Sequence, residues 1–175
     1  MSYTASEIKS TVAGFFRYKK QCPIVAFEAS NRLEAFQGVP ADILVVTKAR
    51  MLYEIEVKIS CADMRQDIKK RKHWFFSNRP NELPVNKFYF AVPVEIEEKA
   101  ISICESLYPY AGLLVVTKFP FKSNALSFGV KQVISPTHLN NKHLSIRDIM
   151  YMVKAQSGTV CRLARDVAIA KADRD

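Results

Sequence analysis

Two neighbouring segments, residues 41–47 and 51–59, constrain the fold most, because the second alternates between apolar and mostly charged side chains and the first places Asp42 before an apolar run. Alternation with a period of two is typical of β-strands that have one face in the core. The connection Lys48-Ala-Arg50 between them is short, which predicts a hairpin. With a loop of this length, antiparallel pairing brings Asp42 directly opposite Glu56.

The predicted register sorts the side chains of both strands by polarity. Glu54, Glu56 and Lys58 share one face with Asp42. The other face is apolar and collects Ile43, Val45, Met51, Tyr53, Ile55, Val57 and Ile59. A shift of pairing by one residue would exchange the two faces of one strand, so the pattern itself supports this register.

The opposed carboxylates of Asp42 and Glu56 suggest a metal site. Two carboxylates directly opposite on a sheet repel each other and are destabilising. A divalent cation such as Mg²⁺ would remove that repulsion, because it accepts carboxylate oxygens as ligands. The adjacent ammonium of Lys58 would then orient or deprotonate a water and stabilise charge on a phosphate. The alternative is a solvated strand face with ordinary cross-strand ion pairs.

The rest of the chain predicts an α/β protein. Helices are expected over residues 4–17, 60–76 and 96–107, and strands over 23–29, 86–92, 112–117 and, more weakly, 125–133. The order α–β–β–β–α–β–α–β combines a meander with alternating elements, which implies a mixed central sheet flanked by helices. A helical tail, interrupted near Gly158, follows from Ser145. We expect one domain over 1–175, with a core over about 4–118 and a helical extension over about 145–172.

The charge balance indicates a polyanionic partner. The chain has 26 Lys and Arg against 17 Asp and Glu, a net charge of +9 at pH 7. Such an excess favours nucleic acid or an anionic surface. The densest basic run is Lys69, Lys70, Arg71 and Lys72. It predicts salt-sensitive binding to a phosphate backbone. The alternative is an amphipathic helix with a solvated basic face and with Trp74 and Phe75 packed inward.

Several other classes of protein are disfavoured. The first residues lack the basic and apolar regions of a signal peptide, and no apolar run approaches the roughly 18 residues of a membrane span, so we expect a cytoplasmic protein without membrane contact. The 4 cysteines are far apart, which argues against a zinc knuckle or a disulfide framework. No glycine-rich phosphate-binding motif is present, which disfavours nucleotide-driven chemistry.

Two sets of motifs resemble a known group of nucleases. Pro40-Ala-Asp42, followed by Glu56-Val-Lys58 on the next strand, resembles the motif of the PD-(D/E)XK nuclease superfamily, whose core is an α–β–β–β–α–β unit. Most of the chain is similar to the MmcB-like DNA-repair family within it. There the E-x-K strand runs into S-x-A-D-x-x-x-D-x-K, and here the sequence reads Glu56-Val-Lys58-Ile-Ser60-Cys-Ala-Asp63-Met-Arg-Gln-Asp67-Ile-Lys69. Residues 87–93 and 111–115 are also similar to that family, whose usual Arg-Ala-Asp is Pro-Ala-Asp here.

The resemblance implies a restriction-endonuclease-like fold and a metal-dependent nuclease that hydrolyses DNA phosphodiester bonds. By this resemblance Asp42 and Glu56 hold Mg²⁺ or Mn²⁺, the backbone carbonyl of Val57 is a third ligand, and Lys58 is the catalytic lysine. A module that binds DNA without cleaving it is the second function that these residues fit. RNA as the substrate and assembly into a homo-oligomer are both compatible with the sequence.

The resemblance also points to residues around this core set. Glu28 corresponds to an acidic residue upstream of the motif, with an ordinary surface glutamate as the alternative. Glu7 corresponds to a catalytic acid in the first helix of some branches, but it also fits a capping box with Thr4. Asp67 and Lys69, in the helix after the lysine, are expected to support the site.

Overall fold

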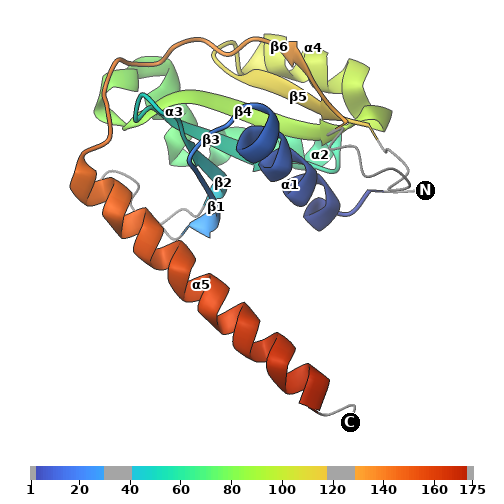
Figure 1. Cartoon of the computed structure of the whole chain (residues 1–175). Coiled ribbons are helices and arrows are strands. Elements are labelled where there is room, and N and C mark those ends of the chain that lie inside the picture. Colours follow the sequence, from blue (N-terminus) through green and yellow to red (C-terminus); the bar gives the residue numbers. More distant parts are fainter. Residues whose placement is uncertain (1–2, 30–40, 118–128, 173–175) are drawn as a thin grey trace. The chain divides into compact units, whose positions relative to one another are not determined.

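A six-stranded mixed sheet lies at the centre of the computed structural model, which describes residues 3–29, 41–117 and 129–172 (Figure 1). Its strands follow one another in sequence order: β1 (Ile24–Ala29), β2 (Ala41–Val46), β3 (Leu52–Val57), β4 (Val85–Pro93), β5 (Gly112–Val116) and β6 (Val130–Ile134). Strands β1 to β3 form an antiparallel meander, β3, β4 and β5 are parallel, and β6 is antiparallel to β5. The predicted α/β class and mixed sheet are confirmed.

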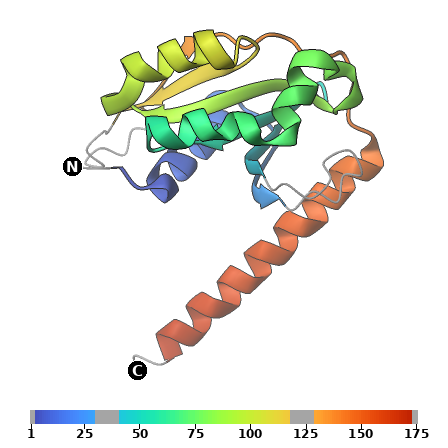
Figure 2. The ribbon, with the colours of Figure 1, turned by 180° about the vertical axis from the view of Figure 1, so that it is seen from behind.

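Helices cover both faces of this sheet (Figures 1 and 2). On one face lie α1 (Ala5–Gly14) and its π-helical continuation η1 (Phe15–Lys19), and on the other lie α2 (Cys61–Gln66), α3 (Arg71–Asn78) and α4 (Glu97–Leu107). The short 3-10 turns are η3 (Asp67–Lys69), η4 (Pro80–Glu82) and η5 (Val94–Ile96). The last helix, α5 (Ile146–Ala172), belongs to a separate unit, because the chain divides into Met1–Leu144 and Ser145–Asp175.

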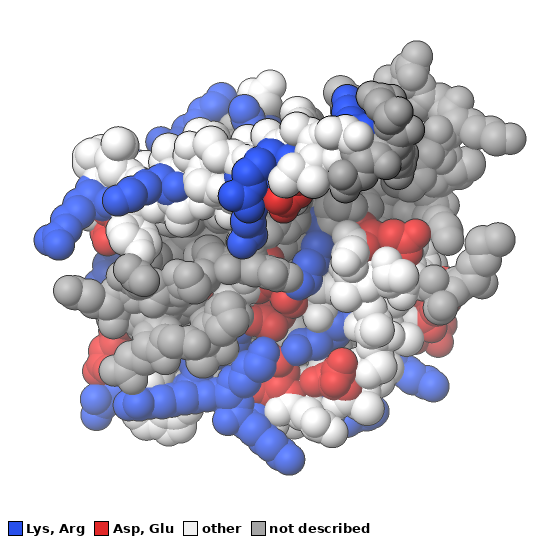
Figure 3. Space-filling model, turned by 90° about the horizontal axis from the view of Figure 1, so that it is seen from below, with Lys and Arg blue, Asp and Glu red and all other residues white. Residues whose placement is uncertain are grey.

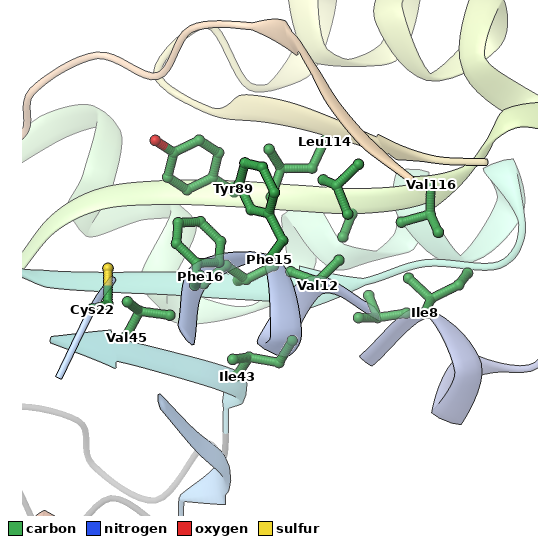
Figure 4. Close-up of a cluster of buried hydrophobic side chains, with 14 residues drawn as sticks. Ile8, Val12, Phe15, Phe16, Cys22, Ile43, Val45, Tyr89, Leu114 and Val116 are labelled. Carbon is green, nitrogen blue, oxygen red and sulfur yellow. The ribbon is translucent and has the colours of Figure 1, made fainter. Parts of the chain in front are cut away.

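The apolar face of the predicted hairpin packs against α1. Thr4 and Glu7 cap this helix reciprocally, as their spacing predicts. Apolar residues at helical spacing then turn Ile8, Val12 and Phe16 toward the sheet, where Ile43, Val45, Ile55 and Val57 meet them (Figure 4). Burial of this shared apolar surface holds α1 and the first three strands together.

The β2–β3 hairpin has the predicted register. Its pairs are Ile43 with Ile55, Leu44 with Glu54, Val45 with Tyr53 and Val46 with Leu52. The turn closes with the Arg50 N–H donating to the Thr47 carbonyl over 2.9 Å, and Arg50 adopts a left-handed conformation with a φ of 59°. The regular ladder ends at the Ile43–Ile55 pair, one residue before the predicted pairing of Asp42 with Glu56.

The predicted helix over residues 60–76 is wrong as a single element. Ser60 caps α2 as expected, but the backbone becomes extended at Lys70, with φ −70° and ψ 130°, before α3 begins. Side chains two residues apart on an unbroken helix point in different directions. The break therefore allows Lys70 and Lys72 to reach the same carboxylate of β3, Glu56.

Two further expectations about the second half of the chain need correction. The interruption predicted near Gly158 is absent, since α5 is continuous through this residue. A single glycine costs roughly 1 kcal/mol of helix stability, which a 27-residue helix tolerates. The weak strand predicted over 125–133 begins at Val130 within the described residues, and the residues before 129 lie outside them.

A buried pair of asparagines ties the segment after β6 to the sheet. The Asn86 side-chain oxygen accepts the Leu52 N–H over 2.6 Å, at the point where the β3–β4 register shifts. Its amide nitrogen donates to the Asn140 carbonyl over 2.9 Å. The Asn140 side chain in turn donates to the Val85 carbonyl over 2.7 Å. We call this pair the asparagine clamp.

Candidate functional site

Six charged side chains gather where β3 faces the α2–α3 segment. They are Glu54, Glu56, Lys58, Asp67, Lys70 and Lys72, and we call them the carboxylate–lysine cluster. The three carboxylates are buried, with side chains at most 4% exposed. Lys70 is the most exposed of the lysines, at 35%. Three negative and three positive charges make the cluster neutral overall, which is the condition under which charges are tolerated in a protein interior.

Glu56 is the centre of the cluster. Its Oε2 accepts a hydrogen bond from Lys70 Nζ over 3.1 Å and lies 3.6 Å from Lys58 Nζ. Its Oε1 contacts Lys72 Nζ. The same ammonium reaches Glu54 Oε1 over 2.5 Å, so Lys72 bridges two neighbouring carboxylates on one face of β3.

Glu54 and Lys72 perturb each other through burial and charge. Burial raises the pKa of Glu54, an effect that the nearby Lys72 partly offsets. Burial alone would lower the pKa of Lys72, but the charges of Glu54 and Glu56 outweigh it and the pKa is raised. Glu54 Oε2 is the buried side-chain oxygen that has no hydrogen-bond partner within the described part of the chain.

Asp67 fixes the position of Lys58. Its Oδ1 lies 2.5 Å from Lys58 Nζ and 2.7 Å from Lys70 Nζ, and its Oδ2 lies 2.6 Å from His73 Nε2. His73 Nδ1 is 2.7 Å from the hydroxyl of Tyr110 on the segment before β5. A neutral imidazole satisfies both contacts when Nε2–H donates to Asp67 and Nδ1 accepts from Tyr110.

The pKa shifts of this chain agree with that protonation pattern. Burial lowers the pKa of His73 and so favours the neutral ring, although the charge and hydrogen bond of Asp67 act in the opposite direction. Burial opposes ionisation of Asp67 as well, but the hydrogen bonds from His73, Lys58 and Lys70 outweigh it. They hold the pKa of the Asp67 carboxyl well below its usual range. Asp67 is therefore negatively charged at neutral pH, beside Lys58.

Asp42 lies at the same end of β3 but has different partners. Its Oδ2 accepts the backbone N–H of Val57 over 2.8 Å, and its Oδ1 lies 2.8 Å from Lys9 Nζ of α1. Its side chain is 24% exposed. Asp42 thus contacts the backbone of the residue that follows Glu56, and its carboxylate takes the place of the next backbone pair in the ladder.

Neither Glu7 nor Glu28, the two acidic residues upstream of the motif, has a described side-chain contact with the cluster. Glu7 serves in the capping box, where its carboxylate accepts the Thr4 N–H over 2.9 Å. Glu28 belongs to β1, between Phe27 and Ala29, which pair with Ile43 and Ala41, so its main chain runs beside that of Asp42. The side chain of Glu28 is outside the described residues.

The basic run divides into exposed and internal residues. Lys69 and Arg71 are exposed, and the Arg71 guanidinium lies 5.3 Å from the centre of the Phe75 ring. Lys72 is buried against Glu54 and Glu56, so its predicted place in a phosphate-binding surface is wrong in this structure. Lys70 is committed to the cluster too. On the face shown in Figure 3, Lys and Arg side chains are interspersed with Asp and Glu.

The alternative for α3, a helix with Trp74 and Phe75 packed inward, also differs from the structure as to which aromatic residues face the core. Trp74 is 52% exposed, whereas His73 and Phe76 are buried. His73 lies among the rings of Phe88, Phe90, Tyr108 and Tyr110. This aromatic shell and the roles of Lys72, His73 and Tyr110 were not predicted from the sequence. One signal was available, since carboxylates on a strand that is covered on both faces require cations from the covering helix.

Comparison with known proteins supports the fold and adds nothing on activity. No family model and no curated protein matches the sequence. A solved structure described as a protein of unknown function from Silicibacter pomeroyi matches with a TM-score of 0.57 and 16% identity, over 94% of this chain and 92% of that chain. Among the described helices, none is both long and apolar enough to cross a membrane. In the same residues, no group of three or more His, Cys, Asp or Glu side chains is arranged to hold a metal ion.

Proposed function

We propose that the protein is a metal-dependent nuclease that hydrolyses DNA phosphodiester bonds at the carboxyl end of β3. The observation that carries this proposal is that Asp42 binds the backbone of Val57, the residue between Glu56 and Lys58. Asp42 accepts the Val57 N–H over 2.8 Å, and Lys58 Nζ lies 3.6 Å from Glu56 Oε2. These residue types in this arrangement resemble the motif of the PD-(D/E)XK superfamily.

The donor atoms at this strand end suit Mg²⁺ or Mn²⁺. Asp42 and Glu56 offer carboxylate oxygens and Val57 a backbone carbonyl, which are the ligands that hard divalent cations prefer. A cation bound there would supply Lewis-acid stabilisation of the phosphate and an acidified water. Both oxygens of Glu56 already contact lysines. Lys70, the most exposed of those lysines, is the side chain that would yield its contact.

The protein's own residues would hold and orient the substrate. The ammonium of Lys58 is fixed by Asp67, which is itself fixed by His73. An ammonium held in this way is positioned to bind a phosphate oxygen on which charge develops. The exposed Lys69 and Arg71 beside the site would neutralise neighbouring backbone phosphates.

The test compares wild type with Lys58→Ala on supercoiled plasmid, linear duplex DNA, single-stranded DNA and RNA, in Mg²⁺, Mn²⁺ or EDTA. Lys99→Ala, on the exposed surface of α4, is the matched lysine control. We expect cleavage of DNA in the presence of metal by wild type and by the control, and none in EDTA or by Lys58→Ala. Cleavage retained by Lys58→Ala, or independent of metal, would overturn the proposal, and cleavage of RNA alone would change its substrate.

A catalytically silent DNA-binding module is the second candidate, and one observation favours it. The three buried carboxylates of the cluster are already matched by three lysines, so they need no metal for charge balance. Binding of Mn²⁺, followed by electron paramagnetic resonance, separates the two functions without relying on activity. The nuclease predicts Mn²⁺ binding that tightens in Lys70→Met and is lost in Asp42→Asn. The silent module predicts salt-sensitive DNA binding and no Mn²⁺ binding by any of these proteins.

A further inference from the structure

The helix α5 carries an apolar seam with heptad spacing. Starting from Ile146, the first position of each heptad is filled by Ile146, Val153, Val160 and Val167. The fourth position is filled by Ile149, Gln156, Leu163 and Ala170. These side chains are largely in solvent, with exposed fractions of 62% for Ile146, 64% for Val160 and 55% for Leu163.

The spacing of this seam is that of a coiled coil. A helix that packs on a globular core usually shows a broad apolar face with a period near 3.6 residues. A strict repeat of seven gives a narrow seam, which stays in contact with a partner helix by supercoiling. The first position is β-branched in all four heptads and the fourth holds leucine once, at Leu163, and β-branched residues at the first position with leucine at the fourth are typical of two-stranded, parallel coiled coils. Gly158 occupies the sixth position, where it faces away from the seam.

Charge complementarity selects a second copy of the same chain as the partner. In a parallel dimer, the seventh residue of one heptad meets the fifth residue of the next heptad on the other chain. α5 has three such pairs of positions, of which the last, Asp166 and Lys171, has opposite charges, while Met152 with Ser157 and Thr159 with Ala164 are uncharged. Two-fold symmetry would form the pair twice, once on each side of the seam.

We infer that α5 is a dimerisation helix, through which two copies of this chain form a parallel, in-register coiled coil. Val153, Val160, Leu163 and Val167 provide its seam. Its 27 residues correspond to nearly four heptads and to a length of about 40 Å. The interface rests on α5 alone and is independent of the proposed nuclease activity.

The first experiment is sedimentation velocity on the full chain. We expect wild type to sediment as a species of twice 19.9 kDa. Val160→Glu combined with Val167→Glu buries charges in the seam, which should weaken dimerisation at least about tenfold and give the single-chain mass. The matched control, Ala155→Glu with Ala168→Glu, adds the same charge at exposed positions outside the seam and should remain dimeric.

The second experiment tests the parallel register by mixing two charge-swapped chains. Asp166→Lys places two lysines opposite each other in its homodimer, and Lys171→Asp places two aspartates opposite each other. Mixed in equal amounts, the two variants should form a heterodimer in preference to either homodimer, because only the heterodimer restores both opposite-charge pairs. Mass spectrometry of the intact complexes, with one chain labelled with ¹⁵N, measures this preference.

Three results would overturn the inference. One is a wild-type chain that stays monomeric at concentrations of about 100 μM. In that case, binding of the helix to phosphatidylglycerol vesicles, or its protection from hydrogen exchange within the monomer, would show what covers the seam instead. Another is a dimer that survives Val160→Glu with Val167→Glu, which would place the interface elsewhere. The third is random mixing of the charge-swapped chains, which would exclude the parallel register.

Discussion

Replacing Lys72 by methionine tests whether the carboxylate–lysine cluster stabilises the fold as a balanced set of charges. Lys72 is 7% exposed and its ammonium contacts both Glu54 and Glu56. Without it, Glu56 keeps Lys70 at 3.1 Å, but Glu54 loses its hydrogen-bonded cation. Leaving one buried carboxylate uncompensated costs about 3–5 kcal/mol. At roughly 2–4 °C per kcal/mol for a chain of this size, the melting temperature should fall by about 6–20 °C.

The stability of Lys72→Met should also depend on pH in a defined direction. Burial already raises the pKa of Glu54 above its ordinary value of 4.5, and removing Lys72 should raise it further. At a pH between the pKa of Glu54 in the unfolded chain and its higher pKa in the folded variant, the folded state binds more protons than the unfolded state. The free energy of unfolding therefore rises as the pH falls through this range. The variant should therefore recover part of its lost stability between neutrality and pH 4.5.

Urea denaturation followed by far-UV circular dichroism at pH 7.5 and pH 5 measures both effects. Lys69→Met is the control, since this exposed neighbour should change the free energy of unfolding by less than about 0.5 kcal/mol. Combining Glu54→Gln with Lys72→Met removes the stranded charge and should recover part of the loss at pH 7.5. Lys72→Met should not cost as little as Lys69→Met, and its loss of stability should not grow as the pH is lowered to 5; either result would refute the role of Lys72 as the counterion of a buried carboxylate.

Three smaller predictions use the same denaturation assay. Tyr110→Phe removes the hydroxyl 2.7 Å from His73 Nδ1 and should cost about 1–3 kcal/mol, so an unchanged midpoint would contradict this hydrogen bond. Below pH 3.8 wild type should lose the stabilisation that comes from the lowered pKa of Asp67. The free energy of unfolding of an Asp67→Asn variant should therefore fall less steeply with decreasing pH, and equal slopes for the two proteins would contradict this. Gly112→Ala would place a methyl group 2.6 Å from the Tyr89 ring and should cost about 1–3 kcal/mol, whereas a neutral effect would mean that the ring moves freely.

The hairpin was predictable from the sequence because two local constraints agree. Alternation along β3 identifies the apolar face of the hairpin, and the short turn before Met51 leaves one register that keeps charges off that face. The mixed sheet follows from the order of the elements. The hairpin and the mixed sheet depend on contacts between neighbours in the sequence or on burial of one strand face. Both kinds of interaction produce a periodic pattern of apolar residues in the sequence.

The helix break at Lys70 and the burial of Glu54 left no such trace. The residues from Ser60 onward have a capping residue and helical spacing, so local propensity favours one helix. The break serves contacts across the fold, in which Lys70 and Lys72 both reach Glu56. Lysine and glutamate are rarely buried unless they are paired, and the sequence alone does not reveal which lysine meets which carboxylate. Tertiary pairing decides both features.

The asparagine clamp has a consequence for the order in which the first unit folds. Asn86 and Asn140 are separated by 54 positions, and α4, β5 and β6 lie between them in the sequence. Contacts of such long range form late, because the intervening loop must close first. Asn86 is fully buried and holds the β3–β4 register shift through Leu52, and its amide group reaches its protein acceptors only when Asn140 and Lys142 arrive. During synthesis, the centre of the sheet would therefore reach its final hydrogen bonding only when the last residues before α5 have emerged from the ribosome.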